Sequence, residues 1–231
     1  SNFRAGVNAG NSIASGGNYN TVVGDEAGTD ITTGDNNVAV GFDAGKASTT
    51  AAQNVLIGSG AGDSGTTFYN NVAIGYLALS ADTLGSNNVA IGKAALAVQN
   101  FTSSTDANNV AIGSNAGAAV TTATQNTFIG GLSGDAFTDG AANTALGFET
   151  LTADTKGNNA VALGHHALST QNFTTTTASY NVAVGSQAGL AVTTGINNTL
   201  VGGLAGDSLT DADYNTAVGF GALTTDVLGS R

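Results

Sequence analysis

One short pattern recurs along this chain of 231 residues and limits the folds open to it. The pattern is Asn, three mostly apolar residues, Gly, two variable residues, a small residue, and then Gly or Leu. Nine of the twelve spacings between its central glycines are 17 residues, one is 18 and two are 21. A fixed short period is the signature of a repeat architecture. The thirteen central glycines are Gly6, Gly24, Gly41, Gly58, Gly75, Gly92, Gly113, Gly130, Gly147, Gly164, Gly185, Gly202 and Gly219.

A longer period lies above the short one. The two 21-residue spacings follow Gly92 and Gly164, which are 72 residues apart. Within each 72, the fourth residue after the central glycine runs Gly, Gly, Leu, Leu. We therefore predict super-repeats over about residues 37–108, 109–180 and 181–231, the last one partial, within a single domain 1–231. Because the chain starts at Ser1 without Met, we expect an excised segment of a longer fibre.

Each short repeat predicts one turn of a β-solenoid. A period of 17 is too short for helix-pair repeats, which need about 33 residues or more. Segments such as "VAIG" are rich in β-formers, and turn signals such as "TTGDNN" and "LGSNN" separate them. The chain is therefore predicted to be all-β, a parallel β-solenoid of about 13 rungs of 17 residues, two of them of 21.

The predicted strand is apolar on both faces. Its first and third residues are mostly Val or Ile, and its middle residue is usually Ala. Successive side chains of a strand point to opposite faces, and a strand apolar on both is normally buried on both. One face can fill the lumen of the solenoid, but a 17-residue coil has no second layer to cover the other. We therefore expect an oligomer of this chain.

An asparagine heads the strand in twelve of the thirteen copies, and Ala160 is the exception. Stacked in register, such amides can hydrogen-bond from rung to rung. We interpret them as a structural ladder, because a residue present in every repeat serves every repeat. The ladder is predicted for Asn37, Asn54, Asn71, Asn88, Asn109, Asn126, Asn143, Asn181, Asn198 and Asn215.

The motif "NNVAIG..AL" resembles the head repeat of trimeric autotransporter adhesins, the YadA-like head, with its "NSVAIG" core. The form "NTAVGF.AL" at residues 215–223 is also similar to repeats of phage tail fibres and other trimeric surface fibres. The resemblance covers the whole chain and implies a homotrimer of left-handed parallel β-rolls outside the cell, on a cell surface or a virion fibre. Rungs of 17 and 21 residues are longer than usual for that family. The resemblance leaves bacterial adhesin and phage fibre both open.

Composition argues against most chemistry. The net charge is −11 with five Lys and Arg, so nucleic-acid binding through phosphates is not expected. No apolar run approaches the length of a membrane span, and there is no cysteine. The only histidines, His165 and His166, are replaced by Lys93 and Ala94 one super-repeat earlier, which argues against a catalytic site. We predict no enzyme activity, no cofactor and no metal.

The two long rungs are the best candidates for recognition, because insertions in solenoids form loops that often bind. Possible receptor contacts are Gln99, Asn100, Phe101, Gln171, Asn172 and Phe173, with each Phe expected to be exposed for stacking on a sugar or folded back as a cap. The predicted function is a structural and adhesive segment, a spacer whose partners are its own copies and a host glycan or protein receptor. The alternative is an ice-binding β-solenoid, which would need a regular threonine array, whereas threonine here is expected in irregular turns. A depolymerase would need paired carboxylates, which the sequence does not offer.

Overall fold

The computed structural model describes residues 1–228, and these residues form strands and turns but no helix. The chain divides into two compact units, Ser1–Asn115 and a second that begins at Ala116. Each unit is described by itself.

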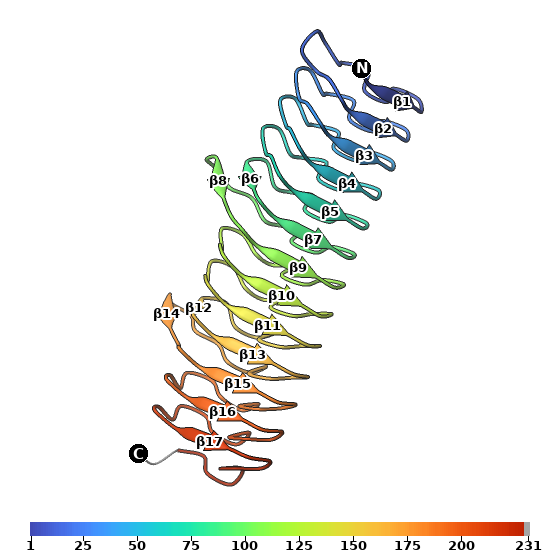
Figure 1. Ribbon diagram of the computed structural model, residues 1–231. Coiled ribbons are helices and arrows are strands. Elements are labelled where there is room, and N and C mark those ends of the chain that lie inside the picture. Colours follow the sequence, from blue (N-terminus) through green and yellow to red (C-terminus); the bar gives the residue numbers. More distant parts are fainter. Residues whose placement is uncertain (229–231) are drawn as a thin grey trace. The chain divides into compact units, whose positions relative to one another are not determined.

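The first unit is a stack of seven turns, each of which contributes one short strand to a parallel sheet (Figure 1). Every strand pairs with the equivalent strand of the next turn without offset, so that Val38, Val55 and Val72 are direct neighbours. The strands are β1 (Phe3–Ala5), β2 (Thr21–Val23), β3 (Val38–Val40), β4 (Val55–Ile57), β5 (Val72–Ile74), β7 (Val89–Ile91) and β9 (Val110–Ile112).

The second unit repeats this arrangement with six turns. Its strands are β10 (Thr127–Ile129), β11 (Thr144–Leu146), β13 (Val161–Leu163), β15 (Val182–Val184), β16 (Thr199–Val201) and β17 (Thr216–Val218). All pairings within it are parallel and in register. The prediction of a parallel β-solenoid of about 13 turns is therefore confirmed, while the left-handed winding and the trimer stay predictions.

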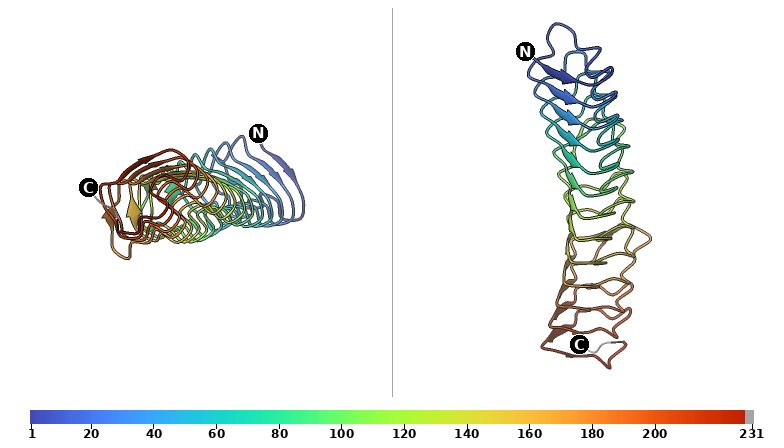
Figure 2. Two further views of the ribbon diagram at one scale, coloured as in Figure 1. Left: turned by 90° about the horizontal axis from the view of Figure 1, so that it is seen from below. Right: turned by 90° about the vertical axis from the view of Figure 1, so that its right-hand side faces the viewer.

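Each unit also contains one small second sheet at its long turn. In the first unit β6 (Gly85–Ser86) pairs with β8 (Thr105–Asp106), and in the second β12 (Gly157–Asn158) pairs with β14 (Thr177–Ala178). Figures 1 and 2 show β8 and β14 projecting beyond the neighbouring turns on the side away from the main strands. The four extra residues of the 21-residue rungs form these projections.

The lumen explains the 72-residue period. The middle residue of each strand is buried inside the coil, and it is Ala in most turns but Leu56 in β4. A Cβ atom added at Gly62 would lie 2.7 Å from Leu56 Cδ2, so the larger strand residue needs glycine opposite it. Turns with Ala73 or Ala90 in the strand have the fully buried Leu79 or Leu96 there instead. Gly, Gly, Leu, Leu therefore keeps the core filled at near-constant volume.

Candidate functional site: an open strand face and two long turns

The outward face of the main strands is apolar and open to solvent in each unit. The first and third residues of nearly every strand are half-buried or exposed, while the middle residue is buried. Exposure reaches 37% at Ile57, 49% at Leu146 and 70% at Val218. Because pairing is in register, Val38, Val55, Val72, Val89 and Val110 form one unbroken apolar row in the first unit. A soluble chain rarely exposes such a contiguous apolar surface without a partner for it.

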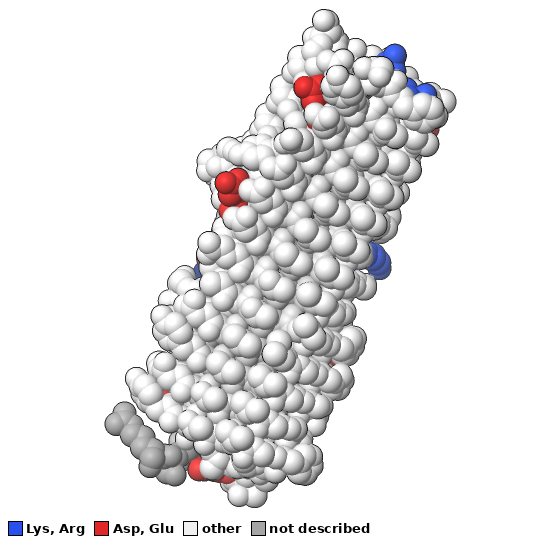
Figure 3. Space-filling view, viewed as in Figure 1, with Lys and Arg blue, Asp and Glu red and all other residues white. Residues whose placement is uncertain are grey.

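Charged side chains are sparse on this face. The space-filling view, taken from the side on which the strands lie, is almost entirely uncharged over the strands of each unit (Figure 3). The strand residues themselves include a single charged side chain, Arg4 in β1, apart from Asp106 in the separate strand β8. A sheet face without charges can be covered by another apolar surface with little desolvation cost.

The strands end at a column of closely packed glycines. Gly58, Gly75 and Gly92 all have φ between +132° and +135°, a region that side chains rarely occupy. A Cβ atom at Gly75 would lie 2.5 Å from the carbonyl oxygen of Gly92, closer than any real contact. Both the conformation and the spacing between turns therefore require glycine at this corner.

Asparagines at the strand heads form the inner polar ladder. The backbone N–H and the side-chain Nδ2 of Asn54 donate to Oδ1 of Asn37 over 3.1 and 3.0 Å. Asn37 Nδ2 also donates across the coil to the carbonyl of Ala51 at 2.7 Å. Where the asparagine is missing, only the backbone N–H of Ala160 donates to Asn143, at 2.9 Å. The same amide-to-amide contacts join Asn71 to Asn88, Asn126 to Asn143, and Asn181 to Asn198 and Asn215.

In the first long turn the ladder leads to a buried carboxylate. Asn109 Nδ2 donates to Gln99 Oε1 at 2.9 Å, and Gln99 Nε2 donates to Asp82 Oδ2 at 2.5 Å. The other carboxylate oxygen accepts the backbone N–H groups of Leu84 and Gly85. All the donors point one way, toward Asp82, which has no proton to give when ionised. This network closes the long turn onto the turn before it.

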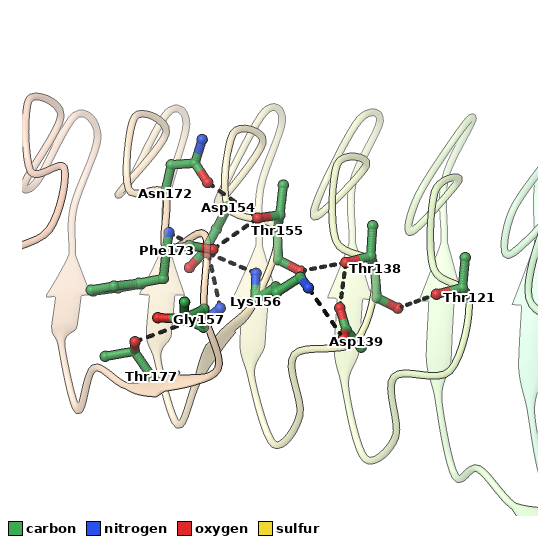
Figure 4. A network of polar contacts seen from close by, with 11 residues as sticks. Thr121, Thr138, Asp139, Asp154, Thr155, Lys156, Gly157, Asn172, Phe173 and Thr177 are labelled. Carbon is green, nitrogen blue, oxygen red and sulfur yellow. Dashed lines mark hydrogen bonds and ion pairs between the residues drawn. The ribbon is translucent and has the colours of Figure 1, made fainter.

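The second unit repeats the network around Asp154 (Figure 4). Asn181 donates to Gln171 at 2.8 Å, and Gln171 Nε2 donates to Asp154 Oδ2 at 2.6 Å. Asp154 Oδ1 also accepts the backbone N–H groups of Lys156, Gly157 and Phe173. On the outer side, Thr155 donates to the Phe173 carbonyl, and Lys156 Nζ lies 3.6 Å from Asp139 Oδ2.

Burial raises the pKa of both Asp82 and Asp154 above the ordinary value of aspartate. The hydrogen bonds from the glutamine side chain and from the backbone N–H groups oppose this shift, because they favour the charged form. Neither carboxylate has a basic side chain paired with it. These aspartates hold the turns together, and they are too buried to meet a substrate.

The structure corrects the expectation of exposed phenylalanines in the long turns. Phe101 and Phe173 are each 6% exposed, and Gln99 and Gln171 are fully buried. A Cβ atom at Gly85 would lie 2.8 Å from Phe101 Cδ2, which shows how closely this ring covers the preceding turn. Of the six predicted contact residues, only Asn100 and Asn172 are exposed, together with the hydroxyl residues 102–104 and 174–176 beside them.

The two histidines lie at the surface of the second unit beside Phe148. The His165 ring stacks on Phe148 with 5.9 Å between ring centroids and 13° between planes. His166 Nε2 lies 3.3 Å from Glu149 Oε2. Among residues 1–228 no three His, Asp or Glu side chains gather in a way that would hold a metal ion.

Two features escaped the sequence reasoning. Asp82 and Asp154 recur at the 72-residue period, each 17 residues before the glutamine that contacts it, so the period held the signal. Threonines also stack in register: the hydroxyls of Thr32, Thr49 and Thr66 each donate to the carbonyl of the residue 17 positions later. These threonines are therefore regular, contrary to expectation.

Comparison with protein-family models, with curated proteins and with solved structures finds no match to this chain. In the part of the chain that the structure describes, there is no helix of the length and apolarity that a membrane crossing requires.

Proposed function

We propose that this chain is a structural and adhesive segment of a homotrimeric extracellular fibre, in which the outward strand faces of the copies cover one another. The single observation behind this proposal is the unbroken apolar row on the outward face of each sheet, open in one chain. Burying it between copies would remove apolar surface from water at about 25 cal/mol per Å².

The number three, the left-handed winding and the extracellular location rest on the resemblance of the "NNVAIG" repeats to the heads of trimeric fibres. The fold is compatible with this role because its inner contacts are spent on holding turns together. The asparagine ladder, the glycine column and the filled lumen leave no cavity for a substrate among the contacts described above. We propose no enzyme activity.

Sedimentation equilibrium tests the assembly. We expect the unmodified chain to sediment at three times the 22.4 kDa mass of one chain. The double variant Ile57→Lys and Leu146→Lys puts one charge on the outward face of each unit, and we expect it to sediment as a monomer. Both positions are already more than one third exposed, so a single chain tolerates the lysine.

The matched control is Thr50→Lys with Thr122→Lys, which adds the same charge at exposed threonines outside the strands. We expect this control to keep the trimeric mass. A folded monomer of the unmodified chain, shown by sedimentation together with a β-rich circular dichroism spectrum, would disprove the proposal.

Ice binding is the second candidate, and the register of the threonines favours it. Thr33, Thr50 and Thr67 are exposed on three successive turns, next to the hydrogen-bonded Thr32, Thr49 and Thr66. The exposed row stops at Leu84 and Phe101, so it spans three turns only. A thermal hysteresis measurement separates the two candidates: activity that is lost in Thr50→Lys would support ice binding.

A further inference from the structure

A column of exposed side chains follows the central glycines, one per turn, on the surface beside the strand ends. In the third turn of the first 72-residue unit this position is Tyr76, which is 55% exposed, and in the fourth turn it is the exposed Lys93. The backbone N–H of Ala94 donates to the Tyr76 carbonyl at 2.9 Å, so these residues are direct neighbours on adjacent turns. Adjacent turns of a parallel sheet are about 4.8 Å apart.

Lys93 is a free cation on an acidic chain. The net charge is −11, and of the chain's three lysines Lys46 and Lys156 are held by Asp43 and Asp139. No carboxylate among residues 1–228 forms an ion pair with Lys93. The next turn places the exposed Ser114 and the half-buried Asn115 beside it, and the Asn115 N–H donates to the Lys93 carbonyl at 2.8 Å.

The second unit carries the same arrangement with other residues. Phe148 is 47% exposed and stacks on His165, and Ser186 and Gln187 follow on the next turn. The side chain that faces His165 is His166, whose own partner is Glu149 at 3.3 Å. An aromatic ring, a base, a hydroxyl and an amide therefore occupy equivalent positions in both units.

We propose that Tyr76 and Lys93 bind an acidic sugar of a glycan, a uronic or sialic acid residue, with Phe148 and His165 as a second, pH-dependent site. A pyranose ring has an apolar C–H face that fits a flat exposed aromatic ring, with hydroxyls for the serine and the amide. Its carboxylate pairs with the base through a charge-assisted hydrogen bond. A neutral sugar would leave Lys93 without a partner, and a plain carboxylate would leave the ring unused. The proposal holds for any oligomeric state in which this column stays exposed.

Titration of the whole chain with 3′-sialyllactose, with a glucuronate oligomer and with lactose, followed by saturation-transfer NMR, tests this. At about pH 7.5 we expect at least one acidic sugar to bind with a Kd near 1 mM, and lactose about tenfold more weakly. Tyr76→Ala and Lys93→Gln should each weaken binding about tenfold. The controls Phe42→Ala, an exposed aromatic with no neighbouring base, and Lys156→Gln, a paired lysine, should leave it unchanged.

Histidine gains its charge between pH 8 and 5, so lowering the pH to about 5.5 should add a second site that His165→Ala removes. Sedimentation of Tyr76→Ala and Lys93→Gln should match the unmodified chain, which separates this proposal from that of the trimer. The proposal is wrong if neither acidic sugar binds at about 10 mM, if lactose binds as well as they do, or if Lys93→Gln leaves the affinity unchanged. It is also wrong if Tyr76→Ala dissociates the oligomer, since the column would then be a contact between copies.

Discussion

At the scale of single residues, the direction of hydrogen bonding fixes why Asp82 is an aspartate. Gln99 and the backbone N–H groups of Leu84 and Gly85 all donate to it. In Asp82→Asn the new amide nitrogen faces one of these donors, and turning Gln99 around would place its nitrogen against that of Asn109. We expect a loss of about 1–3 kcal/mol in the free energy of unfolding, measured by urea denaturation.

A second substitution tests this account by restoring the direction. In the double variant Asp82→Asn with Gln99→Glu, the new carboxylate accepts from both Asn109 and the new amide, so every donor again has an acceptor. We expect this variant to recover most of the lost stability. If the double variant is no more stable than Asp82→Asn alone, hydrogen-bond direction is not what selects Asp82.

The raised pKa values of Asp82 and Asp154 make a prediction about pH. A folded state that holds the proton more tightly than the unfolded chain is stabilised at low pH, and it loses that advantage as pH rises through the raised pKa. Urea unfolding from about pH 3.5 to 7 should therefore show a decline in stability that is smaller in Asp154→Asn. The exposed Asp106→Asn, in a long turn, serves as the control. An equal decline in Asp154→Asn and the unmodified chain would contradict the assignment.

At the scale of one turn, the glycine corner combines two constraints that substitutions can separate. Gly75→Ala meets both a disfavoured φ of +135° and a carbonyl oxygen at 2.5 Å, whereas Gly219→Ala meets a φ of +126° with no atom within 4 Å. Gly203→Ala meets neither, because its nearest neighbour is at 3.4 Å. We expect thermal melting to rank them Gly75 most damaging, then Gly219 at roughly 1–3 kcal/mol, then Gly203 near neutral. Equal effects at Gly75 and Gly219 would show that packing between turns is not limiting.

The turns also show what sequence reasoning reaches and where it stops. The period, the strand at "VAIG" and the apolar outer face follow from spacing and alternation, and the structure has all three. The long turns were harder, because "QNF" looks polar and exposed when read along the chain. Its burial depends on Asp82, which lies 17 residues earlier and becomes a neighbour only when turns stack. Contacts between turns must be read down the columns of the repeat rather than along the chain.

At the scale of the whole molecule, strand pairing in each unit links only consecutive turns, so damage should stay near its source. Hydrogen exchange of Gly75→Ala tests this, because the substituted corner lies between β5 and β7. We expect faster exchange in β4, β5 and β7 and unchanged exchange in β15 and β16, since stability in a solenoid is a sum of turns and of the contacts between neighbours. Gly203→Ala controls for the methyl group itself. Faster exchange in both units alike would mean that the chain unfolds in one step, and recognition sites such as Tyr76 and Lys93 would then depend on every turn rather than on their neighbours.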